Sequence, residues 1–277
     1  GALPSLRRVL DLALQPIDRL DGFFYLPFDQ FREGALRYQF NHIGYTAALY
    51  QFAHTPAFTG YLAEAQRNAI AKLLDRRTWR YWAVENLWGN LRWNPDPIVD
   101  DNVMYSAYLG LQTCLYETMN QDDRYRQPGA LTLEWNEDTR YEHDASTVAD
   151  AVLANLERSR SGLYPCEPNW IYPFCNTFAF NHLIADDRLT GRNRAEPVIE
   201  RARRAYDEGD YCEPDGRIAG LRSEYLGSRG PGGGNMADAM NAYWLNAIMP
   251  DVAQRGHQRL HLAVRGPGLG ERLQAAL

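Results

Sequence analysis

Residues 96–118 read DPIVDDNVMYSAYLGLQTCLYET, the pattern of a long apolar helix that follows an acidic loop. We expect the helix to run from Asn102 to Thr118, with Asp100 or Asp101 as its N-cap, because an acidic side chain there pairs with free N–H groups and complements the helix dipole. Met104 and Tyr108 lie one turn apart on this helix and are predicted to face a central cavity.

The same period of 3.6 residues continues through most of the chain, and only residues 216–221 are expected to pair as strand. The connections carry Gly, Pro, Asn and Asp, as turns do. Helices in antiparallel succession predict an all-α protein with an α/α barrel, a toroid of helical hairpins, in a single domain over residues 1–277. The expected helices cover residues 5–14, 37–52, 59–75, 102–118, 145–158, 176–189, 195–208, 235–248 and 252–262.

The segment from Tyr164 to Asn176 reads YPCEPNWIYPFCN and combines three prolines, alternating aromatic rings and a few polar groups. Its prolines prevent a helix from running through it. A rigid backbone with aromatic walls is typical of a pocket for an apolar molecule. Its candidate site residues are Cys166, Glu167, Tyr172, Phe174, Cys175 and Asn176.

The spacing of Cys166 and Cys175 leaves several interpretations of this pair open. It does not fit the Cys-x2-Cys pattern of zinc knuckles or thioredoxin-like redox sites. A disulfide of this span is sterically feasible, and two buried structural thiols are the plainer interpretation. The four cysteines of the chain are too few for a disulfide scaffold.

Three further clusters each have a functional and a structural interpretation. The aromatic run from Trp79 to Trp93, expected as a loop, either seals the end of the barrel or walls an apolar pocket with Trp88. Residues 142–144 place His143 between two acids, as an acid–base group or as a solvated triplet. Residues 227–235 are rich in glycine and fit a mobile lid or a surface loop, but not a phosphate loop.

The overall composition excludes some classes of partner. The formal net charge of −6 gives no footprint for nucleic acid. No apolar run reaches transmembrane length, and no signal peptide is recognisable, which favours a soluble, cytoplasmic protein. A chain that starts at Gly1 without methionine also fits a removed targeting segment. His257 and His261 share a helix face without a third ligand, so we predict no metal site.

Three runs along the chain combine into one pattern: DPI…NVMY…LGL at 96–111, CEP…CN at 166–176 and DRLTG at 187–191. Together they resemble linalool dehydratase-isomerase and its relatives, over roughly residues 37–251. Members of that family are α/α barrels that form rings of subunits and need no cofactor. They hold a small isoprenoid alcohol in a buried site, where they remove water to give a diene or shift a hydroxyl between allylic positions.

The resemblance implies a site role for Cys166 and Cys175, which match the family's cysteine pair, and for Met104. Other positions depart from the pattern. Tyr108 stands where the family has a histidine, and a family tyrosine of the second helix falls near Asn41 or His42. A late tyrosine of the barrel falls near Ala239, with Asp238 adjacent. The chain is also shorter than the family norm at its C-terminal end, which implies a reduced barrel.

The implied activity is a cofactor-independent lyase or isomerase acting on an isoprenoid alcohol. Ionising such an alcohol requires an acid near the hydroxyl, a base near a hydrogen and dry aromatic walls. A buried thiol of Cys166 or Cys175 can donate a proton while its neighbour accepts one, and Glu167 tunes this pair or is itself the acid. Asp238 is an acid or hydroxyl anchor if it points inward, and otherwise complements a helix start.

Other functions remain open at this point. A terpenoid cyclase would begin by protonating an isoprenoid in the same pocket. A carbohydrate-active helical toroid would use paired carboxylates, and a non-catalytic isoprenoid carrier would turn nothing over. The candidate carboxylates for the hydrolase are Asp100, Asp101, Glu142 and Glu167.

The N-terminal 36 residues are predicted to form an inter-subunit arm of a homo-oligomer. Within them, Asp18 to Phe31 is apolar and aromatic, but Gly22 and Pro27 interrupt it. Such a segment is a poor isolated helix, and the resemblance to a ring-forming family places it on a neighbouring subunit.

Overall fold

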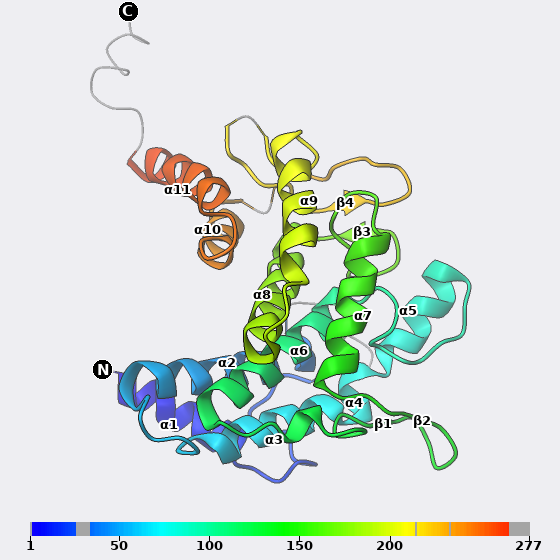
Figure 1. Ribbon diagram of the computed structural model, residues 1–277, viewed down its shortest axis with the longest axis vertical. Coiled ribbons are helices and arrows are strands. Elements are labelled where there is room, and N and C mark those ends of the chain that lie inside the picture. The colour runs from blue at the N-terminus through cyan, green and yellow to red at the C-terminus, as the bar shows by residue number, and fades with distance from the viewer. Residues whose placement is uncertain (1, 26–33, 214, 233, 266–277) are drawn as a thin grey trace, which may run out of the picture.

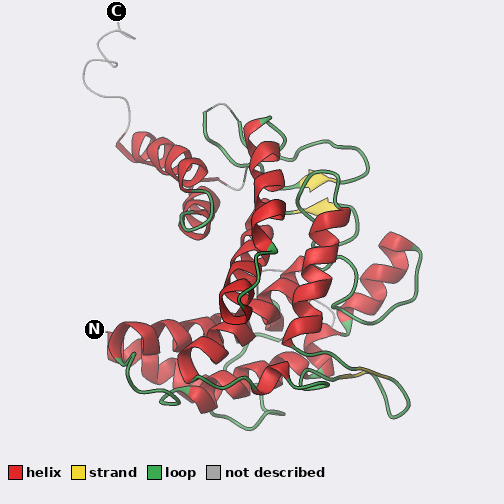
Figure 2. Cartoon of the chain, in the orientation of Figure 1, coloured by secondary structure: helices red, strands yellow, loops and turns green. Residues whose placement is uncertain are grey.

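The computed structural model describes residues 2–25, 34–213, 215–232 and 234–265, and this part of the chain is mostly helical, as predicted (Figure 2). The helices are α1 (Ala2–Ala13), α2 (Leu36–His54), α3 (Ala63–Leu74), α4 (Arg76–Trp79), α5 (Tyr81–Asn90), α6 (Val103–Asn120), α7 (Ala145–Arg158), α8 (Pro173–Thr190), α9 (Ala195–Asp207), α10 (Gly234–Leu245) and α11 (Pro250–Arg265). The short elements are η1 (Arg124–Arg126), β1 (Leu133–Glu134), β2 (Arg140–Tyr141), β3 (Trp170–Ile171) and β4 (Arg222–Ser223).

Helix α6 is the centre of the fold. It packs against α2, α3, α7 and α8, most extensively against α8 (Figure 1). A Cβ atom at Gly110 of α6 would lie 2.1 Å from Cε1 of His182 on α8, so only glycine permits this approach. Across the other face, a Cβ at Gly44 of α2 would lie 2.1 Å from Nε2 of Gln112. Two glycines thus let the three helices come close enough to share one core.

The remaining helices form pairs around this centre. Contacts run in order from α2 to α6, α8 and α10, and each of these helices also packs on a second one. The second helices are α3 on α2, α7 on α6, α9 on α8 and α11 on α10. None of the described helices is long and apolar enough to cross a membrane.

Two predictions about the region before α6 are wrong. The tryptophan-rich run is helical, because Asp75 caps α4 by accepting from the backbone N–H of Arg77 at 2.8 Å and α5 follows directly. Neither predicted aspartate caps α6. The cap residue is Asn102, with a positive φ of 57° and no side-chain capping bond. Asp100 instead pairs with Arg92 and, at 3.1 Å, with Arg158.

Helix α8 begins earlier than predicted. Pro173 occupies its first turn, where the missing N–H of proline is not needed. The predicted strand lies slightly later than residues 216–221, since β4 pairs with β3 in the register Trp170 to Ser223 and Ile171 to Arg222. Within the predicted range, Ile218 forms an isolated bridge with Cys212.

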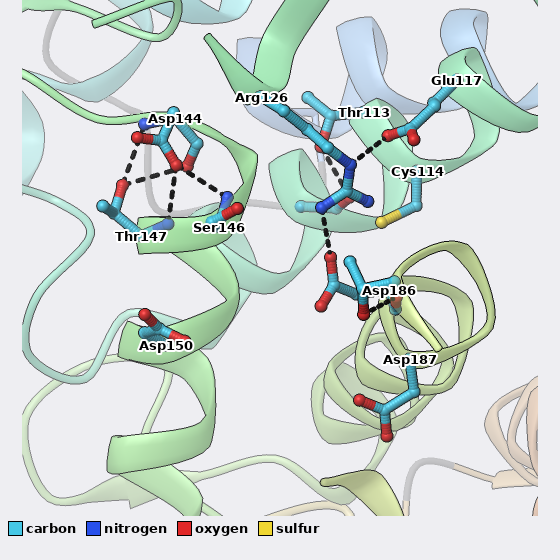
Figure 3. A network of polar contacts seen from close by, with 12 residues as sticks. Thr113, Cys114, Glu117, Arg126, Asp144, Ser146, Thr147, Asp150, Asp186 and Asp187 are labelled. Carbon is cyan, nitrogen blue, oxygen red and sulfur yellow. Dashed lines mark hydrogen bonds and ion pairs between the residues drawn. The ribbon is translucent and has the colours of Figure 1, made fainter. Parts of the chain in front are cut away.

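A network of ion pairs around the buried Asp186 joins η1, α6, α7, α8 and the residue before α9. Arg126 of η1 bonds Glu117 of α6 at 2.7 Å and Asp186 of α8 at 3.0 Å (Figure 3). Arg194 also bonds Asp186 and reaches Asp150 of α7 at 2.5 Å. The carboxylate of Asp186 is therefore held between two guanidinium groups. Figure 3 also shows Asp144 capping α7, with bonds to the N–H groups of Ser146 and Thr147.

Part of the DRLTG run has a structural explanation. Asp187 accepts the backbone N–H groups of Arg194 at 2.6 Å and Ala195 at 2.7 Å, so it caps the start of α9. Gly191 ends α8 with a φ of 70°, a conformation that suits glycine. The motif closes the turn between the two helices.

The described part of the predicted arm packs on its own chain. Lys72, the only lysine in the sequence, donates to the carbonyls of Pro16 and Arg19, both at 2.7 Å. The ring of Phe23 meets that of Phe40 at 4.9 Å. Phe28 and Phe31 of the predicted arm lie outside the described residues.

Candidate active site

The segment before α8 brings its two cysteines together. A tight turn joins Cys166 to Trp170, with the Cys166 N–H donating to the Trp170 carbonyl at 2.9 Å. Proline then starts α8, which places Cys175 in its first turn. Asn176 locks the geometry, because its amide bonds the N–H and the carbonyl of Tyr164, each at 3.0 Å. The predicted contact residue Asn176 is thus fully engaged in holding the backbone.

Cys166 and Cys175 are buried free thiols and lie close to each other. Burial, followed by the neighbouring Cys175 thiol, raises the pKa of Cys166 well above its ordinary value, so this thiol keeps its proton. Tyr108 of α6 completes the group by donating its hydroxyl to the Cys175 sulfur at 3.9 Å. Of the interpretations left open for the pair, the disulfide is excluded, because both cysteines are free. Their predicted site role stays a prediction.

A methionine bridge links α2 to this group. Tyr38 donates to the Met104 sulfur at 3.1 Å, and Arg37 Nη2 lies 3.3 Å from the same atom. The guanidinium also sits over the Tyr81 ring, 4.2 Å from its centroid. Burial raises the pKa of Tyr38 well above its ordinary value, and both thiols add to this effect. Met104 therefore joins α6 to α2 through Arg37 and Tyr38, which were not foreseen, and its predicted contact with a substrate stays a prediction.

Glu167 supplies the titratable acid of the site. Burial raises its pKa from 4.5 to about 7, Arg37 opposes this rise, and Glu85 reinforces it. Its Oε2 atom is shielded from solvent and has no hydrogen-bond partner among the described residues. A carboxyl in this state is divided between its two forms near neutral pH, which suits proton transfer.

Aromatic rings enclose the group. Phe178 stacks on Tyr108 with centroids 3.8 Å apart and meets the predicted wall residue Phe174 edge-on at 5.5 Å. Tyr172 lies close enough to the cluster for Glu167 and both thiols to raise its pKa, after burial, which is the largest cause. Thiols, phenols and aromatic rings thus gather near the Glu167 carboxyl and the Arg37 guanidinium.

Other predicted site residues lie elsewhere. Trp88 is 77% exposed on α5, so it is not a wall of this buried site. Asn41 is buried; its amide donates to the Arg37 carbonyl within α2 at 2.7 Å, its Oδ1 has no partner among the described residues, and its predicted contact with substrate stays a prediction. His42 is exposed on the same helix and lines a separate groove.

Asp238 does not have the apolar surroundings that its predicted role as a neutral acid requires. It is 2% exposed, but it forms an ion pair with Arg259 of α11. It also accepts the backbone N–H of Ile218 at 3.5 Å. The ion pair with Arg259 ties α10 to α11.

The carboxylates proposed for a hydrolase do not converge on one site. Asp100 pairs with two arginines, and Glu142 pairs with Arg140 at 3.0 Å on the surface. Asp101 accepts from Asn90 at 3.1 Å. Of the four, Glu167 alone belongs to the thiol cluster.

The structure supports neither interpretation of His143, the acid–base group or the solvated triplet. It is buried, and its Nε2 lies 3.0 Å from the Asp96 carboxylate. Asp96 also accepts the Ile98 N–H at 3.0 Å. The pair of His143 and Asp96 holds the loop before α6 and has no hydrogen bond to either thiol within the described part of the chain. Residues 142–144 are therefore neither fully solvated nor part of the site.

One family model matches most of the chain. The family model described as linalool dehydratase/isomerase matches residues 37–266, which include both cysteines and every cluster residue named above. The match begins at Arg37 and so covers the methionine bridge on α2. The chain belongs to the linalool dehydratase/isomerase family.

Proposed function

We propose that this protein removes water from, or moves the hydroxyl of, an allylic isoprenoid alcohol in the cluster around Cys166 and Cys175. Its family supports a terpenoid lyase or isomerase in general terms. The observation that carries the finer proposal is the convergence of two free thiols, two phenols and a carboxyl with a pKa of about 7 in one aromatic core.

Glu167 is the proposed acid. An alcohol oxygen is a weak base, so its protonation requires the strongest acid in the site. A carboxyl with a pKa near 7 is a stronger acid than a buried thiol or phenol. The proton moves from the carboxyl to the substrate hydroxyl, the C–O bond breaks, and water leaves with both bonding electrons. An allylic cation remains, and the surrounding aromatic rings stabilise it.

The thiol pair is the proposed base. A carbon next to the cation loses a proton readily, so a weak base is sufficient. Cys175 accepts this proton as its own moves to Cys166, and a proton passes from Cys166 to the carboxylate of Glu167. The C–H electrons form the second double bond. The products are a diene and water, and the acid is restored for the next turnover.

Isomerisation needs the same groups. If water returns to the other end of the allylic cation before a carbon loses its proton, the hydroxyl shifts and no diene forms. The proposed site uses protein acids and bases alone. We further propose that the helical pairs form an open arc of an α/α barrel around it, which the succession of contacts from α2 to α10 supports.

The test is product analysis with purified protein and a ten-carbon tertiary allylic alcohol. Gas chromatography with mass detection should show a diene, or an isomeric alcohol, that is absent from a boiled control. A ring of unchanged mass would instead identify a cyclase. Binding without any product would identify a carrier and refute the proposed activity.

A further inference from the structure

A groove of about 480 Å³ lies between α2, α6 and α10. Its volume is within the range of sites for small molecules. Most of its lining is apolar, and none of the described residues that line it is an acid, an arginine or a lysine. The principal apolar side chains are Leu49, Phe52, Leu115, Met119, Tyr243 and Trp244.

One aromatic layer separates this groove from the thiols. Tyr45 and Trp244 line the groove and also contact Phe178, with centroid distances of 5.9 Å and 4.4 Å. Phe178 stacks on Tyr108, whose hydroxyl reaches Cys175, and Tyr45 lies beside both rings, 6.5 Å from Tyr108 between centroids. Ring contacts thus connect the groove to the thiol cluster.

We propose that the groove is the entrance through which the isoprenoid alcohol reaches the thiols, and that Trp244 is its gate. This inference rests on the proposed function for the identity of the occupant. An apolar molecule with one hydroxyl fits an uncharged, mostly apolar lining that also holds His42, Thr46 and Thr118. The continuity of the ring contacts from groove to thiols favours a substrate in transit over a docked protein.

The choice of Trp244 follows from how the three rings are held. Tyr45 is fixed because its hydroxyl donates to the Tyr108 carbonyl at 2.7 Å. Phe178 is fully buried between helices. Trp244 is the least buried of the three: its ring is half-buried on α10 and packs on Tyr45, Phe178 and Tyr243, while Asn181 holds its backbone carbonyl at 3.2 Å. Movement of this ring exposes Phe178 to the groove.

Thiol alkylation tests the gate without requiring turnover. The intact protein is treated with N-ethylmaleimide, and each cysteine is followed by peptide mass spectrometry. We expect Trp244→Ala to speed alkylation of Cys175 at least tenfold over wild type, and Trp244→Phe to lie between them. Cys114 and Cys212, which are also buried, are internal controls and should react at their wild-type rates. Equal acceleration of all four thiols would show general loosening and overturn the gate, as would unchanged labelling of Cys175.

A second measurement identifies the occupant. Tyr243→Cys places a reactive thiol in the groove, and Leu226→Cys places one on an exposed loop. A ten-carbon tertiary allylic alcohol should slow alkylation at position 243 but not at 226. No protection would overturn the assigned occupant. Loss of a dimer on labelling position 243, seen by light scattering, would assign the groove to a second copy instead. If the alcohol protects position 243 and Trp244→Ala speeds labelling of Cys175, but no product forms, the entrance is supported and the proposed activity is refuted.

Discussion

Replacing Glu167 with glutamine is expected to stabilise the protein while removing its proposed acid. Burial raises the carboxyl pKa from 4.5 to about 7, so the folded state binds this proton more tightly than the unfolded state. The carboxyl's contribution to the free energy of unfolding therefore falls as the pH rises from about 4.5 to about 7, and the loss is complete above pH 7. The pKa difference corresponds to about 3 kcal/mol.

Glu167→Gln has nearly the same size but no charge to desolvate. We expect its stability relative to wild type to rise by about 3 kcal/mol between pH 4.5 and pH 8. The free-energy cost of burying the glutamine amide is the same at both pH values, so it cancels from the change in relative stability. Urea unfolding followed by tryptophan fluorescence measures the difference, and the diene assay should show at least a hundredfold lower kcat.

The matched control is Glu142→Gln, which removes a carboxylate from an exposed surface pair. Its stability difference should change by less than about 0.5 kcal/mol over the same pH range. If Glu167→Gln behaves like this control, the Glu167 carboxylate is adequately solvated, and the reasoning that makes it the acid is refuted.

Three further outcomes follow from named contacts. Asp186→Asn leaves two arginines with a weaker partner and should cost about 3 kcal/mol in urea unfolding. Tyr108→Phe keeps the ring stack but removes the hydroxyl bonded to Cys175, so kcat should fall about tenfold with an unchanged melting temperature. Asp238→Asn breaks the pair with Arg259 and should lower stability, while the pH profile of turnover keeps its descending limb near pH 7.

The helical class and several boundaries were predictable because they depend on local patterns. The helix over residues 145–158 is confirmed at both ends, since an aspartate cap starts it and the apolar period is regular. The extent of α8 was harder to predict, because Pro173 both stops one segment and starts the next helix. The tryptophan-rich run was mistaken for a loop, because its aromatic content hid a helical period.

The site was predictable where it is local in sequence. Cys166, Glu167 and Cys175 come from one short segment, so their types and spacing were visible together. Arg37 and Tyr38 were missed, because their contact with Met104 joins positions more than sixty residues apart. The surroundings of Asp238 were missed for the same reason. Its local neighbours are small and apolar, but it pairs with Arg259 of another helix.

The four buried cysteines allow the most direct test of the thiol pair. Each is changed to alanine in turn, which removes one buried thiol per variant and gives a comparable packing change. Melting temperature and diene formation from a ten-carbon tertiary allylic alcohol are measured for all four. We expect Cys166→Ala and Cys175→Ala to lose at least a hundredfold in kcat, and Cys114→Ala and Cys212→Ala to stay within threefold of wild type. Full turnover by the Cys166 and Cys175 variants, or equal losses in all four, would contradict a catalytic thiol pair.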